Sequence, residues 1–346
     1  MRKINVRRID PLVFLLAIFI ASCGGGGSDS NSSLPAHTTP PPAQTMQGIL
    51  DSATSGSIDG IVVYIDKNAS EPQSFASGVQ DKTNSEPADS ASLFKIASLS
   101  KLFIAVAATK LVNQNGLQMN DSLAMWLPTL AGQIQNSENI SIKQMLEHRS
   151  GIPDFDSQVG FSWQDAHQDI DETLAFSLNL PADFAPDARY EYSNTNYLLI
   201  AKVLDTALGF SHRLFIQNEI LTPLGMTDTF SLLEEVDTNQ LIHGYWDGTD
   251  RIMQDYAIPG GSMISTVKDV AIFMRALNTG ELLSVEERQL YPYFFNHSGW
   301  VPGYQSIAQY HQDIDTVVIQ FVNTTGSGSE DLASATFADI AEFLRN

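Results

Sequence analysis

The sequence predicts a mixed α/β fold, in which an antiparallel sheet is flanked by N- and C-terminal helices and an all-helical lobe is inserted between its strands. Strand-like runs rich in β-branched residues occur near both ends of the chain, whereas the long middle stretch has the composition of helices and loops. A nearly all-apolar helix follows the first strands, and such a helix belongs in the centre of a fold.

The N-terminal part supplies the first predicted elements. Thr45–Ala53 can form a short helix, and Gly60–Asp66 is a strand that Ser74–Val79 can join. The apolar helix begins with Ser98 and is expected to end near Asn115–Gly116, a common helix stop.

The remaining elements follow the helical stretch at residues 117–260. Ser265–Asn278 is an amphipathic helix, because its apolar residues recur at helical spacing. Tyr304–Tyr310 and Thr316–Phe321 are expected to pair as a hairpin, and Asp331–Leu344 closes the chain as a helix.

The first residues have the pattern of an export signal. Residues 1–22 carry a basic start, an apolar core at Pro11–Ile20 that is too short to span a membrane, and small residues before Cys23. This stretch resembles a bacterial lipobox, in which the cysteine becomes a lipidated first residue. Residues 23–43 are then a flexible tether, and 44–346 form the folded domain. We therefore expect a bacterial membrane lipoprotein that faces the periplasm or the cell exterior.

Charge and composition exclude several partners. The 346-residue chain has a formal net charge of −21, which argues against binding nucleic acid or adsorbing to anionic lipid. Cys23 is the only cysteine, so no intramolecular disulfide can form. Six of the seven histidines show no ligand spacing, so no metal or other cofactor is predicted. These are His37, His148, His167, His212, His243 and His311.

A Ser-x-x-Lys pair at the start of the apolar helix is the first sign of catalysis. The pattern occurs three times, as Ser92/Lys95, Ser98/Lys101 and Ser265/Lys268. Only Ser98 leads directly into the apolar helix, where Lys101 shares its face. Burial lowers the pKa of a lysine toward that of a usable base, and a serine hydroxyl needs such a base to become a nucleophile.

Two further polar segments can complete this site. Tyr192 can shuttle a proton beside a lysine, and Asn194 can hydrogen-bond both the lysine and a substrate carbonyl. The alternative is a helix cap at Ser193 or Asn194. His297-Ser298-Gly299-Trp300 can form an edge strand that a substrate backbone approaches, or a glycine-rich turn that enters a hairpin.

In their order and spacing, these three motifs resemble the serine β-lactamase and penicillin-binding-protein superfamily. The likeness is greatest to its branch of class C β-lactamases, D-alanyl-D-alanine carboxypeptidases and esterases. Phe94–Lys101, Ile142–Asp154 and Pro259–Ala271 resemble further segments of that branch, and the similarity covers residues 47–345.

The resemblance implies roles for the motif residues. Ser98 attacks a carbonyl and forms an acyl-enzyme, while Lys101 and Tyr192 move its proton and later activate water. Which of these two residues is the general base stays open. Asn194 orders the lysine and the substrate amide. His297 and Ser298 contact the substrate or complete the proton network, and Gly299 belongs to the same substrate-binding segment. The backbone amides of Ser98 and Trp300 hold the oxyanion.

The implied activity is that of a D-alanyl-D-alanine carboxypeptidase-like peptidase on cell-wall peptides or related amides. A carboxylesterase and a class C-like β-lactamase are alternatives, as is a penicillin-binding sensor without turnover. Many β-lactamases carry lysine where this chain has His297, and histidine is only partly charged near neutrality. The histidine therefore favours a peptidase, amidase or esterase, with a small molecule or peptide as substrate.

Overall fold

The computed structural model of the chain describes residues 45–68 and 70–346, which belong to one compact unit. The predicted export signal, Cys23 and the tether lie outside the described residues. Across the described ranges, none of the helices combines the length and the apolar character needed to cross a membrane.

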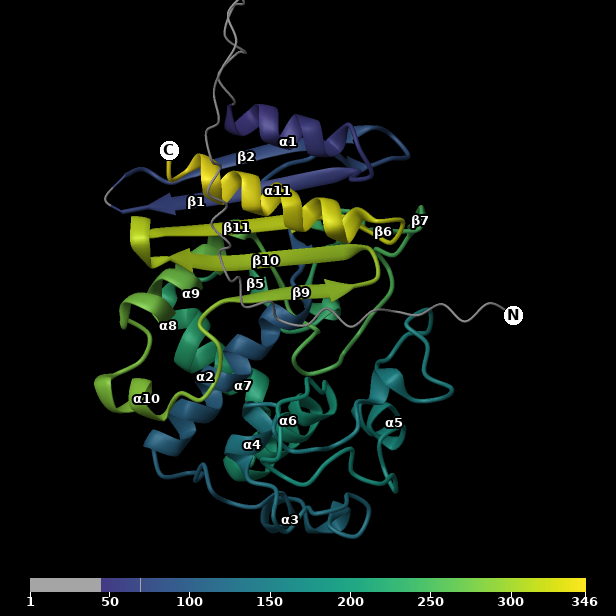
Figure 1. Ribbon diagram of the computed structural model, residues 1–346, viewed down its shortest axis with the longest axis vertical. Helices are drawn as coiled ribbons and strands as arrows, with labels where there is room; N and C mark the ends of the chain where they lie inside the picture. The colour runs from purple at the N-terminus through teal and green to yellow at the C-terminus, as the bar shows by residue number, and fades with distance from the viewer. Residues whose placement is uncertain (1–44, 69) are drawn as a thin grey trace, which may run out of the picture. The chain divides into compact units, whose positions relative to one another are not determined.

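A six-stranded antiparallel sheet forms one half of the molecule (Figure 1). Its order is β3-β2-β1-β11-β10-β9, so three strands from the N-terminal part lie together and meet the three C-terminal strands where β1 pairs with β11. Ile61 of β1 faces Val322 of β11, which places the two β-branched runs side by side in the core. The bounds are β1 Gly60–Lys67, β2 Gln73–Asp81, β3 Glu86–Pro87, β9 His297–Val301, β10 Tyr304–His311 and β11 Thr316–Val322.

Helices cover both faces of the sheet. Helix α1 (Met46–Thr54) and helix α11 (Ser329–Phe343) lie side by side on one face, where their apolar residues join one core cluster with β1 and β11. Helix α9 (Val267–Thr279) contacts the same strands from the opposite side. The predicted antiparallel sheet with flanking terminal helices is therefore confirmed.

Helix α2 (Ser100–Asn113) is the buried centre of the second half. Every residue from Ser100 to Thr109 is buried. The helix contacts α6 (Thr195–Leu208), α7 (His212–Ile216) and α10 (Val285–Leu290). A short 3₁₀ turn, η1 (Ala97–Leu99), leads into it from the sheet side. Its end agrees with the prediction, because Asn115 adopts a left-handed conformation (φ 61°) just beyond the last turn.

The middle of the chain is helical up to Leu224 and then departs from the all-helical expectation. Its later part carries the two-residue strands β5 (Thr229–Phe230), β6 (Tyr245–Trp246) and β7 (Thr249–Asp250). Each pairs with a neighbouring segment, β6 for example with β12 (Thr324–Thr325), because extended backbone beside the main sheet needs hydrogen-bond partners.

The other elements are α3 Leu123–Trp126, α4 Ile142–Leu146, α5 Ile170–Ala175, α6 Thr195–Leu208, α7 His212–Ile216, a π turn at Gln217–Leu221, α8 Thr222–Leu224, and α10 Val285–Leu290. Two more short strands, β4 Phe94–Lys95 and β8 Ile264–Ser265, pair with each other beside β5. Further 3₁₀ turns occupy Pro128–Leu130, Phe155–Ser157, Leu233–Glu235, Thr238–Gln240 and Gln312–Ile314.

Candidate active site

Ser98 stands on a tight turn where the sheet side meets helix α2. Ala97 before it has a φ of 51°, a left-handed conformation that costs a residue with a side chain about 1–3 kcal/mol. Two serines hold this turn: Ser306 Oγ donates to the Ile96 carbonyl at 2.8 Å, and Ser100 Oγ donates to the Ala97 carbonyl at 2.6 Å. Ser98 is thereby left partly exposed between buried neighbours.

Lys101 lies one helical turn further on and points back at Ser98. Its Nζ is 3.0 Å from Ser98 Oγ, 2.8 Å from Asn194 Oδ1 and 2.9 Å from the Gly260 carbonyl oxygen, so each ammonium hydrogen has a partner. Burial lowers the pKa of Lys101 to about 7, although the nearby Asp154 and Asp156 carboxylates oppose this shift. Near neutral pH the amine is therefore ready to accept the proton of Ser98.

Tyr192 approaches Ser98 from the other side. Its hydroxyl donates to Ser98 Oγ at 3.1 Å, and its ring stacks on His148 with centroids 4.2 Å apart. Burial raises the pKa of Tyr192 far above its usual range. The phenol thus keeps its proton, whereas Lys101 readily loses one, so the geometry and the charges favour the lysine as base.

The side chain of Asn194 links the lysine to two carboxylates. Its Oδ1 accepts from Lys101, and its Nδ2 donates to Asp154 Oδ2 and to Asp156 Oδ2, each at 3.2 Å. Asn194 occupies the N-cap position of α6, as the helix-cap alternative expects, but its side chain makes no cap bond and contacts the lysine and the two aspartates instead. Burial, reinforced by Asp156, raises the pKa of Asp154.

Strand β9 brings the third motif against the nucleophile turn. His297 to Val301 form an edge strand that pairs with β10, so the alternative of a plain turn is wrong. A Cβ on Gly299 would lie 2.8 Å from the Ser98 nitrogen and 2.6 Å from the Ile96 oxygen, which leaves room for glycine alone. The unpaired side of the strand is where a substrate backbone can add.

His297 is held by protein groups at both ring nitrogens. Its Nε2 is 2.7 Å from the Tyr293 hydroxyl, and its Nδ1 bonds the Ser298 carbonyl oxygen. Burial and the nearby Lys101 lower the pKa of His297 to about 4. The sequence suggested a histidine partly charged near neutrality, but in this setting the ring is neutral at pH 7.

Five residues at the site escaped the sequence analysis. His148 and Asp154 lie in the segment 142–154 and Gly260 lies in the segment 259–271, and both segments were noted only for their resemblance. Asp156 lies two residues beyond the first segment. Gly260 has a φ of +81°, and a Cβ there would lie 2.9 Å from Lys101 Cγ. No sequence feature indicated Tyr293, because it belongs to none of the motifs and lies in a loop without periodic residues.

The two other Ser-x-x-Lys pairs do not form contacts of this kind. Ser92 Oγ donates to Gln80 Oε1 at 2.6 Å, while Lys95 donates to main-chain carbonyls. Ser265 Oγ bonds Thr229 at 2.8 Å, and Lys268 is exposed. Within residues 45–68 and 70–346, no cluster of three or more His, Cys, Asp or Glu side chains is arranged to hold a metal ion.

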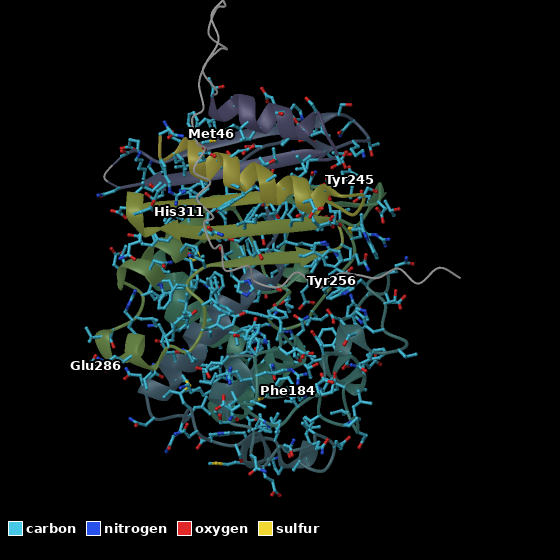
Figure 2. The ribbon with its side chains drawn as sticks, in the orientation of Figure 1. Met46, Phe184, Tyr245, Tyr256, Glu286 and His311 are labelled. Atoms are coloured by element: carbon cyan, nitrogen blue, oxygen red, sulfur yellow. The ribbon has the colours of Figure 1, made fainter. Side chains whose placement is uncertain are left out.

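Aromatic side chains line the end of β9. Trp163 packs edge-on against Trp300, with centroids 6.0 Å apart, and against Tyr256 at 5.4 Å. Tyr256 lies at the level where the sheet meets the helical half (Figure 2). Both tryptophans are partly exposed and add apolar surface beside the edge strand.

Comparison with known proteins finds a matching family model and related sequences. The family model described as Beta-lactamase matches residues 43–294. A penicillin-binding protein of Bacillus subtilis (strain 168) is 34% identical over 157 residues, which are 44% of this chain and 33% of that protein. An unguisins hydrolase of Aspergillus violaceofuscus is 28% identical over 250 residues, 66% of this chain and 43% of that protein. These matches thus span less than half of either relative.

A solved structure shares the fold. D-amino acid amidase from Ochrobactrum anthropi SV3, complexed with L-phenylalanine, superimposes with a TM-score of 0.76 over 87% of this chain and 99% of that one, at 24% identity. At this identity the likeness concerns the fold alone.

Proposed function

Because the chain belongs to the β-lactamase family and is a serine hydrolase of the acyl-enzyme type, we propose that it cleaves amide bonds of D-alanyl-D-alanine-like cell-wall peptides or related amides through Ser98. The observation that carries this proposal is the pair of hydrogen bonds at one oxygen. Ser98 Oγ lies 3.0 Å from Lys101 Nζ and 3.1 Å from the Tyr192 hydroxyl. One partner can take the serine proton, and the other can give a proton to the leaving amine.

The proposed reaction begins when neutral Lys101 accepts the Ser98 proton and Oγ attacks the substrate carbonyl. The backbone amides of Ser98 and Trp300 stabilise the oxyanion. The C–N bond then breaks as Tyr192 donates its proton to the leaving nitrogen, and Lys101 returns a proton to Tyr192. Neutral Lys101 then takes a proton from a water molecule as the water oxygen attacks the acyl carbon. The acyl–Oγ bond breaks, Lys101 returns the proton to Ser98 Oγ, and the acyl product leaves.

The preference for an amide derived from a D-amino acid rests on two kinds of support. Relatives include a penicillin-binding protein, and the shared fold is that of a D-amino acid amidase. Trp163 and Trp300 offer apolar surface for a substrate side chain. A carboxylesterase is the second candidate, because the neutral ring of His297 suits an uncharged ester as well as an amide.

A substrate panel with wild type and Ser98→Ala tests this proposal. The panel contains a D-Ala-D-Ala peptide, a D-amino acid amide, a short nitrophenyl ester, a penicillin and a cephalosporin. We expect turnover of the peptide or the amide, and an acyl mass on wild type that is absent from Ser98→Ala. Faster ester turnover would favour the esterase, and β-lactam turnover the β-lactamase. A penicilloyl adduct that never hydrolyses would indicate a sensor.

We further propose that Cys23 is lipidated and anchors the enzyme to a bacterial membrane, facing the periplasm or the exterior. The lipobox-like segment and the small and polar residues after it support this. Cys23→Ala should lose incorporation of a clickable fatty acid and move from the membrane to the soluble fraction. Equal labelling of both forms would refute the anchor.

A further inference from the structure

We propose that His148 and Tyr293 act as positioning residues that hold His297 as a neutral ring with its proton on Nδ1, so that the site prefers substrates without a free carboxylate beside β9. The preference rests on the proposed amide hydrolysis and narrows it: it favours the related amides over D-Ala-D-Ala peptides, which end in a free carboxylate. The hydrogen-bond chain itself stands on distances between named atoms.

The hydrogen-bond chain begins at the backbone N–H of Ser193, which can only donate. Ser193 N–H donates to His148 Nδ1 at 3.2 Å, and Asn196 Nδ2 lies 3.5 Å from the same nitrogen. The Asn196 amide is oriented this way because its Oδ1 accepts from Ser150 Oγ at 2.6 Å. His148 Nδ1 is therefore an acceptor, and burial lowers the pKa of His148, so the single proton sits on Nε2.

The middle of the chain is the Tyr293 hydroxyl. It lies 3.4 Å from His148 Nε2 and 2.7 Å from His297 Nε2. Because the His148 N–H donates to the phenol oxygen, the phenol hydrogen points to His297. Burial raises the pKa of Tyr293 well above its usual range, so this hydrogen stays in place.

The downstream end is a backbone carbonyl, which can only accept. His297 Nδ1 bonds the Ser298 oxygen, so Nδ1 carries the proton and Nε2 accepts from Tyr293. The Ser193 amide and the Ser298 carbonyl, at the two ends of the hydrogen-bond chain, therefore each require the same donor-to-acceptor direction. Each ring has one donor and one acceptor nitrogen, as a neutral imidazole requires.

A second proton on His297 would have to enter at Nε2, where the phenol hydrogen already lies. The ionisable groups around this ring are Lys101, Tyr192, Tyr293 and His148, and the charge on Lys101 disfavours another cation. His297 consequently offers a substrate neither a charge nor a free N–H. A carboxylate beside Ser298 gains nothing from it, whereas an amide or ester avoids the cost of burying a charge.

The test uses the folded enzyme labelled with ¹⁵N at histidine, as wild type, Tyr293→Phe and the control Tyr291→Phe. Tyr291 is also buried, and its hydroxyl donates to the Phe294 carbonyl at 2.9 Å, so the control removes a comparable bond away from His297. Wild type and Tyr291→Phe should show protonated Nδ1 and bare Nε2 from pH 6 to 8. Tyr293→Phe should raise the titration midpoint of His297 above about 4, because the phenol hydrogen no longer occupies Nε2, while burial and Lys101 still keep it below the ordinary value.

The kinetic arm compares a peptide amide with the same peptide as a free acid at pH 6. In Tyr293→Phe the preference for the amide, measured as the ratio of kcat/KM values, should fall by about tenfold, mainly through the KM of the acid, as expected for a new hydrogen bond to a charged group. Tyr291→Phe should keep the wild-type ratio. If Tyr293→Phe does not fold, His148→Phe is the second variant, since it frees the phenol hydrogen to turn away and should also raise the midpoint.

A proton on Nε2 in wild type at pH 7, or equal shifts in the two tyrosine variants, would overturn the proposal. An unchanged amide-to-acid ratio in Tyr293→Phe with a raised midpoint would overturn the substrate preference. If neither peptide is hydrolysed but the spectra agree, the chain of hydrogen bonds is supported and the proposed amide hydrolysis is what fails.

Discussion

Two lysines six positions apart, Lys101 and Lys95, experience nearly the same burial. Both belong to Ser-x-x-Lys patterns, and both are almost inaccessible, at 1% and 6% exposure. Burial lowers the pKa of each to about 7. Each ammonium even lies 5.1 Å from the centroid of a tyrosine ring, that of Tyr192 for Lys101 and that of Tyr304 for Lys95.

Their hydrogen-bond partners separate them. Lys101 contacts the Ser98 hydroxyl, which can surrender a proton. Lys95 donates to the carbonyl oxygens of Arg251, Ile252 and Gln254 at 3.1, 2.8 and 2.6 Å, none of which can exchange one. A buried lysine with a lowered pKa is thus no sign of catalysis by itself, and Lys95 instead fixes the loop before Tyr256.

The largest difference is expected when each lysine becomes methionine. Lys101→Met should reduce kcat for the best substrate by about 10⁴-fold, because Ser98 loses its base. Lys95→Met should keep kcat within about tenfold of wild type, since its partners are main-chain oxygens that exchange no proton with Ser98. Single-turnover acylation, followed by mass, measures both. Equal losses would erase the distinction between the two lysines.

The neighbouring tyrosines should differ in the same sense by a smaller amount. Tyr192→Phe is expected to lower kcat by about 10²-fold, because the leaving group of the proposed amide cleavage loses its proton donor. Tyr304→Phe breaks the bond from its hydroxyl to the Ile242 carbonyl, at 2.9 Å, and should cost about 1 kcal/mol of stability with kcat retained. Urea unfolding alongside steady-state kinetics separates these effects, and a comparable kinetic loss in Tyr304→Phe would contradict this account.

The pH dependence of kcat/KM shows which lysine must lose its proton for the reaction. Lys101 must be neutral to accept a proton, so kcat/KM should rise about tenfold per pH unit on the acid side and level off above pH 7, where the pKa of Lys101 lies. Lys95→Met should show the same limb at the same pH. If the acid limb of the profile disappeared in Lys95→Met, the titrating group would be Lys95 and not Lys101.

The smallest effect concerns stability. The pKa of Lys95 is about 7 in the folded chain and 10.5 as its ordinary value, so the unfolded chain binds the extra proton between these pH values. The free energy of unfolding therefore rises with pH in this window, by at most about 1.4 kcal/mol per pH unit for each such lysine. Lys95→Met should flatten this slope, measured by urea unfolding at pH 7.5, 8.5 and 9.5. An unaltered slope would mean that Lys95 titrates normally.

The sequence predicted the parts of the fold that depend on local pattern. The strands at Gly60 and Thr316 and the apolar helix after Ser98 were foreseen, because periodicity and β-branched runs carry them. The short strands after Leu224 were not, since two-residue pairings depend on partners distant in the chain.

The same limit applies to the site. Ser98, Lys101, Tyr192 and Asn194 were named from motifs, and the structure brings them together. The neutrality of His297 was not foreseen. It depends on burial and on the nearby Lys101, which only the folded chain brings together.

The pairing of β1 with β11 has a consequence for how the chain folds. Ile61 pairs with Val322, which is far away in the sequence, so the centre of the sheet cannot form until nearly the whole polypeptide has been synthesised. Until then, β1 and β2 form an open-edged hairpin that other chains can pair with. We expect refolding to be slow and sensitive to protein concentration, and a chain that stops before β11 to aggregate rather than to form a smaller stable enzyme.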